Sequence, residues 1–185
     1  MTSREPYQSL ETLYRSLQPG LLHFAVNIVR NRDDAEELVN DAFLAVWQRR
    51  DTLQLDNSLR AYLFTAVRNR CLNHLKKPRL MWESEADDDF PEPISADITE
   101  KLSAAETEAL ISRLIDRLPL RCRQIFLLSR IEQLSHREIA TLMDLSVKTV
   151  ENQIGIALKY LKECLYSGKG SGNLDKSIIK RYLHA

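Results

Sequence analysis

The sequence predicts an all-α protein in which a flexible acidic linker joins two small helical domains, the second containing a helix-turn-helix. Apolar residues recur at helical spacing on both sides of residues 78–104. That segment holds two basic and eight acidic residues and three of the six prolines, and it has no sustained apolar period. The predicted organisation is therefore a first domain at residues 8–77, a linker at 78–104, a second domain at 105–166 and a tail at 167–185.

The composition excludes several classes of protein. With 185 residues, 44% of them hydrophobic and 28% charged, the chain can bury one moderate core or two small ones. Its longest apolar run, Ala42 to Trp47, is too short to span a bilayer, and MTSREPYQ carries no apolar targeting segment, so a cytoplasmic location is expected. The odd, widely spaced set of Cys71, Cys122 and Cys164 predicts buried thiols rather than disulfides.

The beginning of the first domain has helical periodicity. Its apolar stripe consists of Leu10, Leu13, Tyr14, Leu17, Leu21, Phe24 and Ile28. Pro19 and Gly20 interrupt this stripe and predict a kink or a break, so either a helix pair or one bent helix fits.

The next segment, DDAEELVNDAFLAVWQRR, is the clearest amphipathic helix. Its inner stripe consists of Ala35, Leu38, Val39, Ala42, Phe43, Val46 and Trp47. Acidic residues at its start and arginines at its end complement the helix dipole. The opposite face carries Glu37, Asn40, Asp41 and Leu44, which form either a solvated face with one stray leucine or a docking surface for a basic partner.

The third segment, SLRAYLFTAVRNRCLNHLKK, has five basic residues and no acidic ones. Tyr62, Phe64 and Asn69 lie among these basic residues. Basic charge supplies phosphate affinity and aromatic faces accept unstacked bases, so the segment suits single-stranded or melted nucleic acid. Alternatively, Phe64 belongs to the core with the inner stripe of Leu59, Leu63 and Val67.

The second domain predicts two scaffold helices followed by a helix-turn-helix. TEALISRLIDRL forms the first scaffold helix, and Pro119 opens the second, LRCRQIFLLSRIEQ. Ser135 and Glu138 then make a capping box before REIATLM, and Ser146 caps a final helix after a break at Asp144. The small Ala140 suits the close approach of two helices in such a unit.

The outer face of the final helix suits reading a DNA groove. The inner stripe is expected at Val147, Val150, Ile154, Ala157, Leu158 and Leu161. The outward residues are Lys148, Thr149, Asn152, Ile156 and Lys159, with Gln153 at the margin. Amides can pair with adenine, Thr and Ile can contact a thymine methyl, and Lys can reach phosphate or guanine. Glu151 argues against this interpretation, and a hairpin that merely packs is the alternative.

Taken together, these stretches resemble the extracytoplasmic function (ECF) sigma factors, the compact class of bacterial RNA polymerase initiation subunits, over residues 8–166. DAEELVNDAFLAVW resembles the polymerase-binding helix and SLRAYLFTAVRNRCLNHLKK the promoter-melting helix. LPLRCRQIFLLSRIEQLSHREIATLMDLSVKTVENQIGIALKYLK resembles the second conserved domain, and its ending is similar to that of Bacteroidetes members.

The resemblance implies three sets of site residues. The set that engages the clamp helices of the largest polymerase subunit is Glu37, Asn40, Asp41 and Leu44. The set that captures the melted minus-ten element is Asp56, Asn57, Ser58, Arg60, Tyr62, Arg68 and Asn69. The set that reads the minus-thirty-five element is Ser146, Lys148, Thr149, Asn152, Gln153 and Ile156.

The resemblance also implies partners and the absence of others. The partners are core RNA polymerase, promoter DNA and an anti-sigma factor, which is often membrane-bound in this family. Neither a cofactor nor a small-molecule substrate is expected. The acidic linker is either a solvated tether or, by resemblance, a segment that threads through the polymerase near the RNA exit path.

Several residues depart from the family pattern. Asp144 stands where the family often has glycine, and Glu151, Gln153, Ile156 and Leu158 replace residues that are frequently basic. We therefore expect the isolated second domain to bind promoter DNA weakly unless polymerase holds it in place. The tail, GKGSGNLDKSIIKRYLHA, begins as a flexible Gly/Ser link, and Ser177–Leu183 could form a short docked helix.

Two other classes of function remain as alternatives. An enzyme finds little support, because no phosphate-cradling glycine loop or Ser, His and carboxylate arrangement can be singled out in the sequence. Cys71 and His74 lie one helical turn apart, but two ligands do not make a zinc site. A two-domain DNA-binding regulator would bind DNA without polymerase and would open no promoter.

Overall fold

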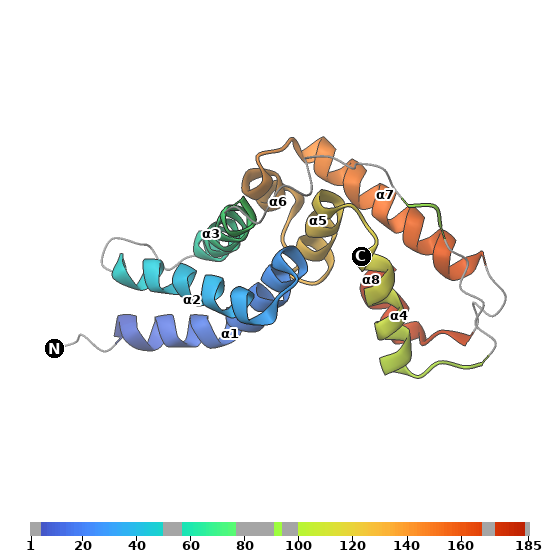
Figure 1. Ribbon diagram of the computed structural model, residues 1–185, viewed down its shortest axis with the longest axis horizontal. Helices are drawn as coiled ribbons and strands as arrows, with labels where there is room; N and C mark the ends of the chain where they lie inside the picture. Colours follow the sequence, from blue (N-terminus) through green and yellow to red (C-terminus); the bar gives the residue numbers. More distant parts are fainter. Residues whose placement is uncertain (1–4, 50–56, 77–90, 94–99, 168–172, 184–185) are drawn as a thin grey trace. The chain divides into compact units, whose positions relative to one another are not determined.

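The computed structural model describes residues 5–49, 57–76, 91–93, 100–167 and 173–183. The regular elements of these residues are the α-helices α1 to α8 (Figure 1). The chain divides into two compact units, the first containing α1 to α3 and the second containing α4, α5, the start of α6, α7 and α8. Most of the predicted acidic linker, Asp56 and the Gly/Ser stretch at 168–172 lie outside the described residues.

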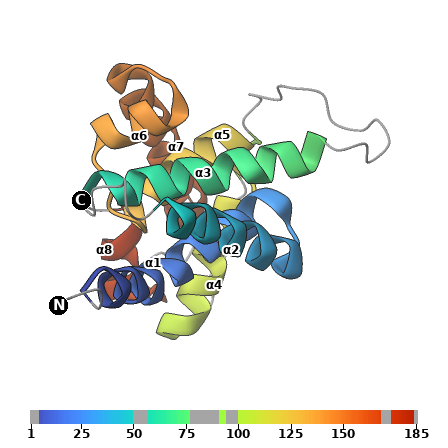
Figure 2. The same cartoon turned by 90° about the vertical axis from the view of Figure 1, so that its left-hand side faces the viewer.

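The first unit is a bundle of three helices. The helices α1 (Glu5–Val29), α2 (Arg32–Gln48) and α3 (Asn57–Lys76) each pack against the other two (Figures 1 and 2). Each contributes an apolar stripe to the core, and Phe24 of α1 meets Phe64 of α3 edge to face with ring centroids 5.5 Å apart. Phe64 therefore belongs to the core rather than to an exposed nucleic-acid face, because its side chain is fully buried.

The helix α1 runs through Pro19 without ending. Of the two arrangements that the sequence left open, a single helix is the one formed. A proline inside a helix removes one backbone hydrogen bond and costs about 3 kcal/mol. Buried side chains after the proline, including Leu21, Phe24 and Ile28, hold the second half of α1 against α2 and α3 and offset that cost.

The predicted inner stripe of α2 is buried except at its margins. Ala35, Val39, Ala42, Phe43 and Val46 are buried, as expected. Trp47 is 38% exposed, so its assignment to the core is wrong. The reason is geometric: residues at i to i+12 spread over more than the width of one buried face, and Trp47 falls at the edge of that face. The helix begins at an Asn31 cap whose side chain accepts the backbone N–H groups of residues 33 and 34.

Four helices of the second unit share one apolar cluster, and the start of α6 completes the unit's five helices. These five are α4 (Ala104–Asp116), α5 (Leu120–Arg130), α6 (His136–Met143), α7 (Val147–Tyr166) and α8 (Lys176–Leu183). The cluster includes Ile111 of α4, Phe126 of α5, Leu161 of α7 and Ile178 of α8. Pro119 precedes α5 as expected. A capping box of Ser103 and Glu106 begins α4 within the predicted linker.

The tail contributes α8 to the core of this unit. Ile178, Ile179, Tyr182 and Leu183 are buried there, and α8 contacts both α4 and α7. The backbone N–H of Asp175 donates to Thr107 Oγ1 at 3.1 Å. The helix is one residue longer than the predicted Ser177–Leu183 segment, and it packs as an integral part of the unit.

Two hydrogen bonds to one carboxylate join α8 to α4. Glu108 Oε1 accepts from Arg181 Nη1 at 3.0 Å and from the Tyr182 hydroxyl at 3.2 Å. Because Tyr182 is buried beside this carboxylate, the pKa of its phenol is raised.

Candidate functional site

The outer face of α2 presents an apolar centre with polar neighbours. Glu37, Asn40 and Asp41 are exposed, and Leu44 is 54% exposed, as the sequence predicts. Asn40, Leu44 and Trp47 stand at i, i+4 and i+7, so the partly exposed indole lies on the same face. Sequence reasoning missed Trp47 because it assigned the indole to the core. An apolar centre rimmed by polar groups is typical of a protein-binding surface.

Tyr14 of α1 extends this surface and orients one of its residues. Its hydroxyl donates to Asn40 Oδ1 at 3.1 Å, and its ring meets Phe43 edge to face at 4.7 Å. Because the Asn40 carbonyl is engaged, its NH₂ group is the part of the amide left to donate to a partner. Sequence reasoning placed Tyr14 in the inner stripe, whereas it is partly exposed.

The α2 backbone is tied to α3 at the same level. Arg70 Nη2 donates to the Asp41 backbone carbonyl at 3.4 Å. The Asp41 carboxylate stays on the surface, so the pair of carboxylates at Glu37 and Asp41 gives this face acidic character. Such a face suits a basic protein partner.

The predicted residues of α3 fall into two groups that point in different directions. Tyr62 and Asn69 are exposed and stand at i and i+7, on one face. Asn73, a further turn along this face, is also exposed and was not predicted. An exposed aromatic ring beside amides can stack on and hydrogen-bond to unpaired bases.

Arg60 and Arg68 are half-buried and lie away from that face. The Arg60 guanidinium carbon lies 6.0 Å from the ring centroid of the buried Phe64. Arg60 therefore takes part in packing as well as supplying charge. Asn57 and Ser58 begin α3, but the placement of their side chains, like Asp56, lies outside the described residues.

The helix-turn-helix has its predicted caps. Ser135 Oγ accepts the Glu138 N–H at 3.3 Å, and Glu138 Oε2 accepts the Ser135 N–H at 2.8 Å, which completes the capping box. Ser146 Oγ accepts the Thr149 N–H at 3.0 Å and starts α7. The spacing of these residues was sufficient to predict both caps.

The turn between α6 and α7 has a left-handed residue. Asp144 has φ 55°, and the Leu145 N–H reaches back to the Ala140 carbonyl at 2.8 Å, as in a Schellman motif. Glycine adopts this conformation most easily, so an aspartate is unusual at this position.

The exposed face of α7 carries Lys148, Asn152 and Ile156 at i, i+4 and i+8. These three side chains share one solvent-exposed face of the helix. Gln153 is half-buried at the margin, as expected. Ser146 and Thr149 share a hydroxyl hydrogen bond at 2.8 Å, so both take part in capping α7.

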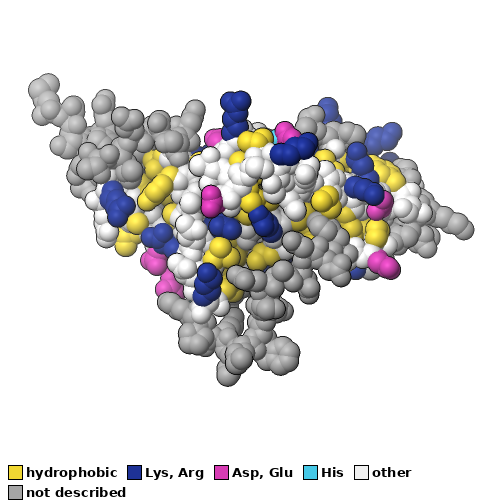
Figure 3. Space-filling view, turned by 90° about the horizontal axis from the view of Figure 1, so that it is seen from above, with side chains coloured by type: hydrophobic (Ala, Val, Ile, Leu, Met, Phe, Trp, Pro, Cys, Tyr) yellow, Lys and Arg dark blue, Asp and Glu magenta, His cyan; other side chains and the backbone are white. Residues whose placement is uncertain are grey.

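Glu151 lies within salt-bridge distance of a lysine and a histidine. One carboxylate oxygen is 3.6 Å from Lys148 Nζ, and the other is 4.0 Å from His136 Nδ1. The neighbouring lysine thus offsets the repulsion that a carboxylate would exert on DNA phosphates. Basic, acidic and apolar side chains are interspersed over the face seen in Figure 3. The exposed face of α7, which includes Lys148, Glu151 and Ile156, is likewise chemically mixed rather than uniformly basic.

The inner stripe of α7 differs from the prediction at three positions. Val147 is 37% exposed and Leu158 is only half-buried, so both lie at the edge of the packed face. Tyr160, which was not assigned to the stripe, is buried, and burial raises its pKa to about 12. Val150, Ile154, Ala157 and Leu161 are buried as expected.

The three cysteines are free and buried, as predicted. Burial raises the pKa of the Cys71 thiol to about 12. The neighbouring His74 turns toward Asp34 of α2, with Nε2 3.4 Å from Oδ2. In the described part of the chain, no three His, Cys, Asp or Glu residues gather as a metal site would require.

None of the helices within the described ranges has the length and apolar character needed to cross a membrane.

The chain matches two domain families. Residues 13–80 match Sigma-70 region 2, and residues 108–161 match Sigma-70, region 4. The first match covers α2, α3 and most of α1, and the second includes the helix-turn-helix.

Proteins that are similar to most of this chain are RNA polymerase sigma factors. The chain is 29% identical over 156 residues to the ECF RNA polymerase sigma factor RpoE of Cereibacter sphaeroides, with 82% of this chain and 83% of the relative covered. It is 30% identical over 140 residues to the RNA polymerase sigma factor CnrH of Cupriavidus metallidurans, with coverages of 71% and 73%.

Solved structures agree on the fold. The sigma factor RpoE of Bartonella quintana, solved with the anti-sigma factor NepR, has a TM-score of 0.61 at 19% identity, and the match covers 84% of this chain and 95% of that one. CnrH, solved with the cytosolic domain of CnrY, has a TM-score of 0.59 at 24% identity, with coverages of 88% and 95%.

Proposed function

The chain belongs to the ECF sigma factors, RNA polymerase subunits that direct promoter-specific transcription initiation, and on that premise we propose how its two units divide this work. The first unit binds core polymerase and the melted minus-ten element, and the second reads the minus-thirty-five element. The observation that carries this proposal is the capped helix-turn-helix whose α7 leaves Lys148, Asn152 and Ile156 facing outward.

The outer face of α2 is the polymerase-binding surface. Leu44 supplies its apolar centre, Glu37 and Asp41 supply the negative charge, and Asn40 offers a directed amide donor. Trp47 and Tyr14 belong to the same surface by their position. Burial of the leucine and the indole against a partner would supply affinity, while the carboxylates would select a basic partner.

The exposed face of α3 is the surface for the minus-ten element. Tyr62 can stack on an unpaired base, and Asn69 and Asn73 can hydrogen-bond to base edges or phosphates. Arg60 and Arg68 contribute positive charge from half-buried positions. Asp56, Asn57 and Ser58 stay in the proposal by family resemblance alone.

The outer face of α7 reads the minus-thirty-five element. Asn152 and Gln153 suit adenine, Ile156 suits a thymine methyl, and Lys148 suits guanine or phosphate. Ser146 and Thr149 act by fixing the start of α7 and thereby the register of these side chains. With Glu151 among them, we expect tight binding to promoter DNA only within the holoenzyme.

An anti-sigma factor is the third partner. Two similar sigma factors were solved with NepR and with the cytosolic domain of CnrY. A comparable partner would cover the apolar and acidic surface of α2 and so prevent polymerase binding. We place the protein in the cytoplasm as a non-enzymatic subunit whose catalytic partner is polymerase.

Run-off transcription with core polymerase tests the function. Specific transcripts should appear only when the chain is added, and Asp41→Arg should remove them because it reverses the charge of the α2 surface. Glu163→Arg makes the same change in the second unit and should leave transcription in place. If core polymerase alone produced the same transcripts, the proposed function would be wrong. If Asp41→Arg had no effect, the assignment of the α2 surface would be wrong.

A further inference from the structure

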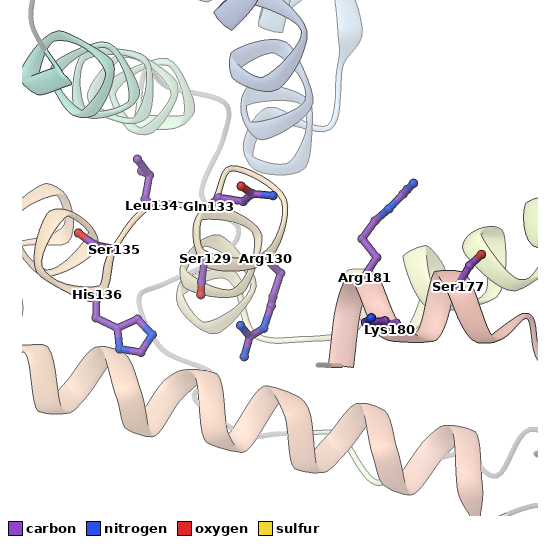
Figure 4. A pocket seen from close by; sticks show the side chains of 9 residues that line it. All are labelled: Ser129, Arg130, Gln133, Leu134, Ser135, His136, Ser177, Lys180 and Arg181. Carbon is purple, nitrogen blue, oxygen red and sulfur yellow. The ribbon is translucent and has the colours of Figure 1, made fainter. Parts of the chain in front are cut away.

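A basic cavity of about 650 Å³ opens on the second unit, between the end of α5, the start of α6 and α8. Figure 4 shows Arg130 and His136 on one side and Ser177, Lys180 and Arg181 of α8 on the other. Among the described residues that line it, none is acidic. The cavity therefore gathers cationic and hydroxyl groups from segments that are far apart in the sequence.

Some of this charge is already compensated and some is available. The Arg181 guanidinium donates to Glu108 and is therefore partly compensated. Lys180 is exposed, and the Arg130 Nε is buried without a hydrogen-bond partner in the described part of the chain. Arg130 lines the cavity, so the rest of its guanidinium and Lys180 are the charge that a ligand there could contact.

The start of α6 adds a further attraction for anions. The positive end of a helix dipole lies at its first turn, where backbone N–H groups point outward. The Glu138 carboxylate in the capping box offsets part of this potential. The remaining donors, from Arg130, Lys180 and the serine hydroxyls at 129 and 177, suit the several acceptor oxygens of a phosphate.

The position of the cavity indicates where this phosphate comes from. In a helix-turn-helix the second helix enters the major groove while the first crosses the DNA backbone. His136, which lines the cavity, is also within 4.0 Å of Glu151 in the second turn of α7, so the cavity lies beside the reading helix. The α7 face itself has few basic residues, and a separate phosphate contact would compensate for that deficit.

We propose that this cavity binds a backbone phosphate of promoter DNA next to the minus-thirty-five element, with Lys180 and Arg130 as its main ligands. The inference rests on the proposed reading role of α7. It assigns a DNA-binding role to α8, which lies beyond residue 161, where the match to the region 4 family ends. The tail is thus part of the DNA interface as well as part of the core.

The test compares two charge reversals on α8 in the reconstituted holoenzyme. Lys180→Glu removes a cavity ligand, whereas Lys176→Glu makes the same change one turn earlier, outside the cavity lining. Lys180→Glu should weaken promoter binding about tenfold and reduce the slope of log affinity against log salt by about one, the effect of one lost phosphate contact. Lys176→Glu should change affinity less than about twofold.

Sequence dependence separates a phosphate contact from base recognition. Lys180→Glu should weaken promoter binding by the same factor when the minus-thirty-five bases are altered, since every sequence presents the same phosphates. Equal effects of Lys180→Glu and Lys176→Glu would overturn the proposal.

A free anion is the other source of the same chemistry. The melting temperature of the full chain is measured with and without millimolar inorganic phosphate or a nucleoside triphosphate. If the anion raised the melting temperature of wild type but not of Lys180→Glu, and Lys180→Glu left the slope of log promoter affinity against log salt unchanged, the DNA assignment would be overturned in favour of a soluble ligand. If the wild-type holoenzyme opened no promoter, the proposed function would fail, whereas specific transcription that ignores Lys180→Glu would remove this inference alone.

Discussion

Leu44→Ala should weaken binding of the chain to core polymerase without destabilising the chain. Complete burial of a leucine side chain contributes about 1.5–3 kcal/mol. Leu44 is 54% exposed in the free chain, so roughly half of that energy, about 0.8–1.6 kcal/mol, remains to be gained when a partner covers it. Since 1.4 kcal/mol corresponds to a factor of ten, the dissociation constant should rise by about 4- to 15-fold.

The measurement is a fluorescence titration of labelled chain with core polymerase, accompanied by a thermal unfolding curve for each variant. Leu75→Ala is the matched control, because Leu75 is a 39% exposed leucine on α3 away from the proposed surface. Its dissociation constant should stay within about twofold of wild type. If Leu44→Ala bound polymerase as well as Leu75→Ala did, the α2 face would not be the apolar centre of the interface.

Four further predictions concern the residues from α4 to α8. Asn152→Ala should lower transcription from a preferred promoter about tenfold and relax selection at one base pair, which a promoter library would detect as lost enrichment at that position. Asp144→Gly should raise the free energy of unfolding by about 1 kcal/mol in urea titrations, because glycine adopts φ 55° without steric cost; a fall in stability would contradict this explanation of the turn. Tyr182→Ala should cost about 3–5 kcal/mol and speed hydrogen exchange in α4, while Tyr166→Ala, the same change at an exposed position, should leave this exchange nearly unchanged. Burial and the Glu108 carboxylate raise the pKa of Tyr182 in the folded chain. The contribution of its neutral phenol to the free energy of unfolding is therefore fully present below about pH 10 and is lost as pH rises through the folded-state pKa. In alkali, the free energy of unfolding should fall more steeply with pH for wild type than for Tyr182→Phe.

Local features of the chain were the most predictable. The capping box of Ser135 and Glu138 and the Ser146 cap each span three residues, so the sequence contains all the groups that make them. The same spacing at Ser103 and Glu106 went unnoticed because acidic composition assigned that segment to the linker. Exposure of Leu44 was also predictable, since its position in the helical period is opposite the centre of the buried stripe.

Residues at the margins of a stripe depended on the neighbouring helices. Trp47 was assigned to the core and is partly exposed, whereas Tyr160 was left out of it and is buried. Periodicity gives the direction in which a side chain leaves its own helix, but the packing of adjacent helices decides whether a marginal position is covered. The same limit applies to Arg60, whose place over Phe64 follows from the bundle.

Neighbouring residues along the chain were sufficient to predict most of the helices, the caps at Ser135 and Ser146, the helix-turn-helix and, through resemblance, the sigma factor family. Three features followed from packing between distant segments: α1 continues through Pro19, Tyr14 holds Asn40, and α8 completes the second core and its basic cavity. Those features join residues that are tens of positions apart, and their formation depends on whether the burial and hydrogen bonds gained exceed the conformational entropy lost in bringing the segments together.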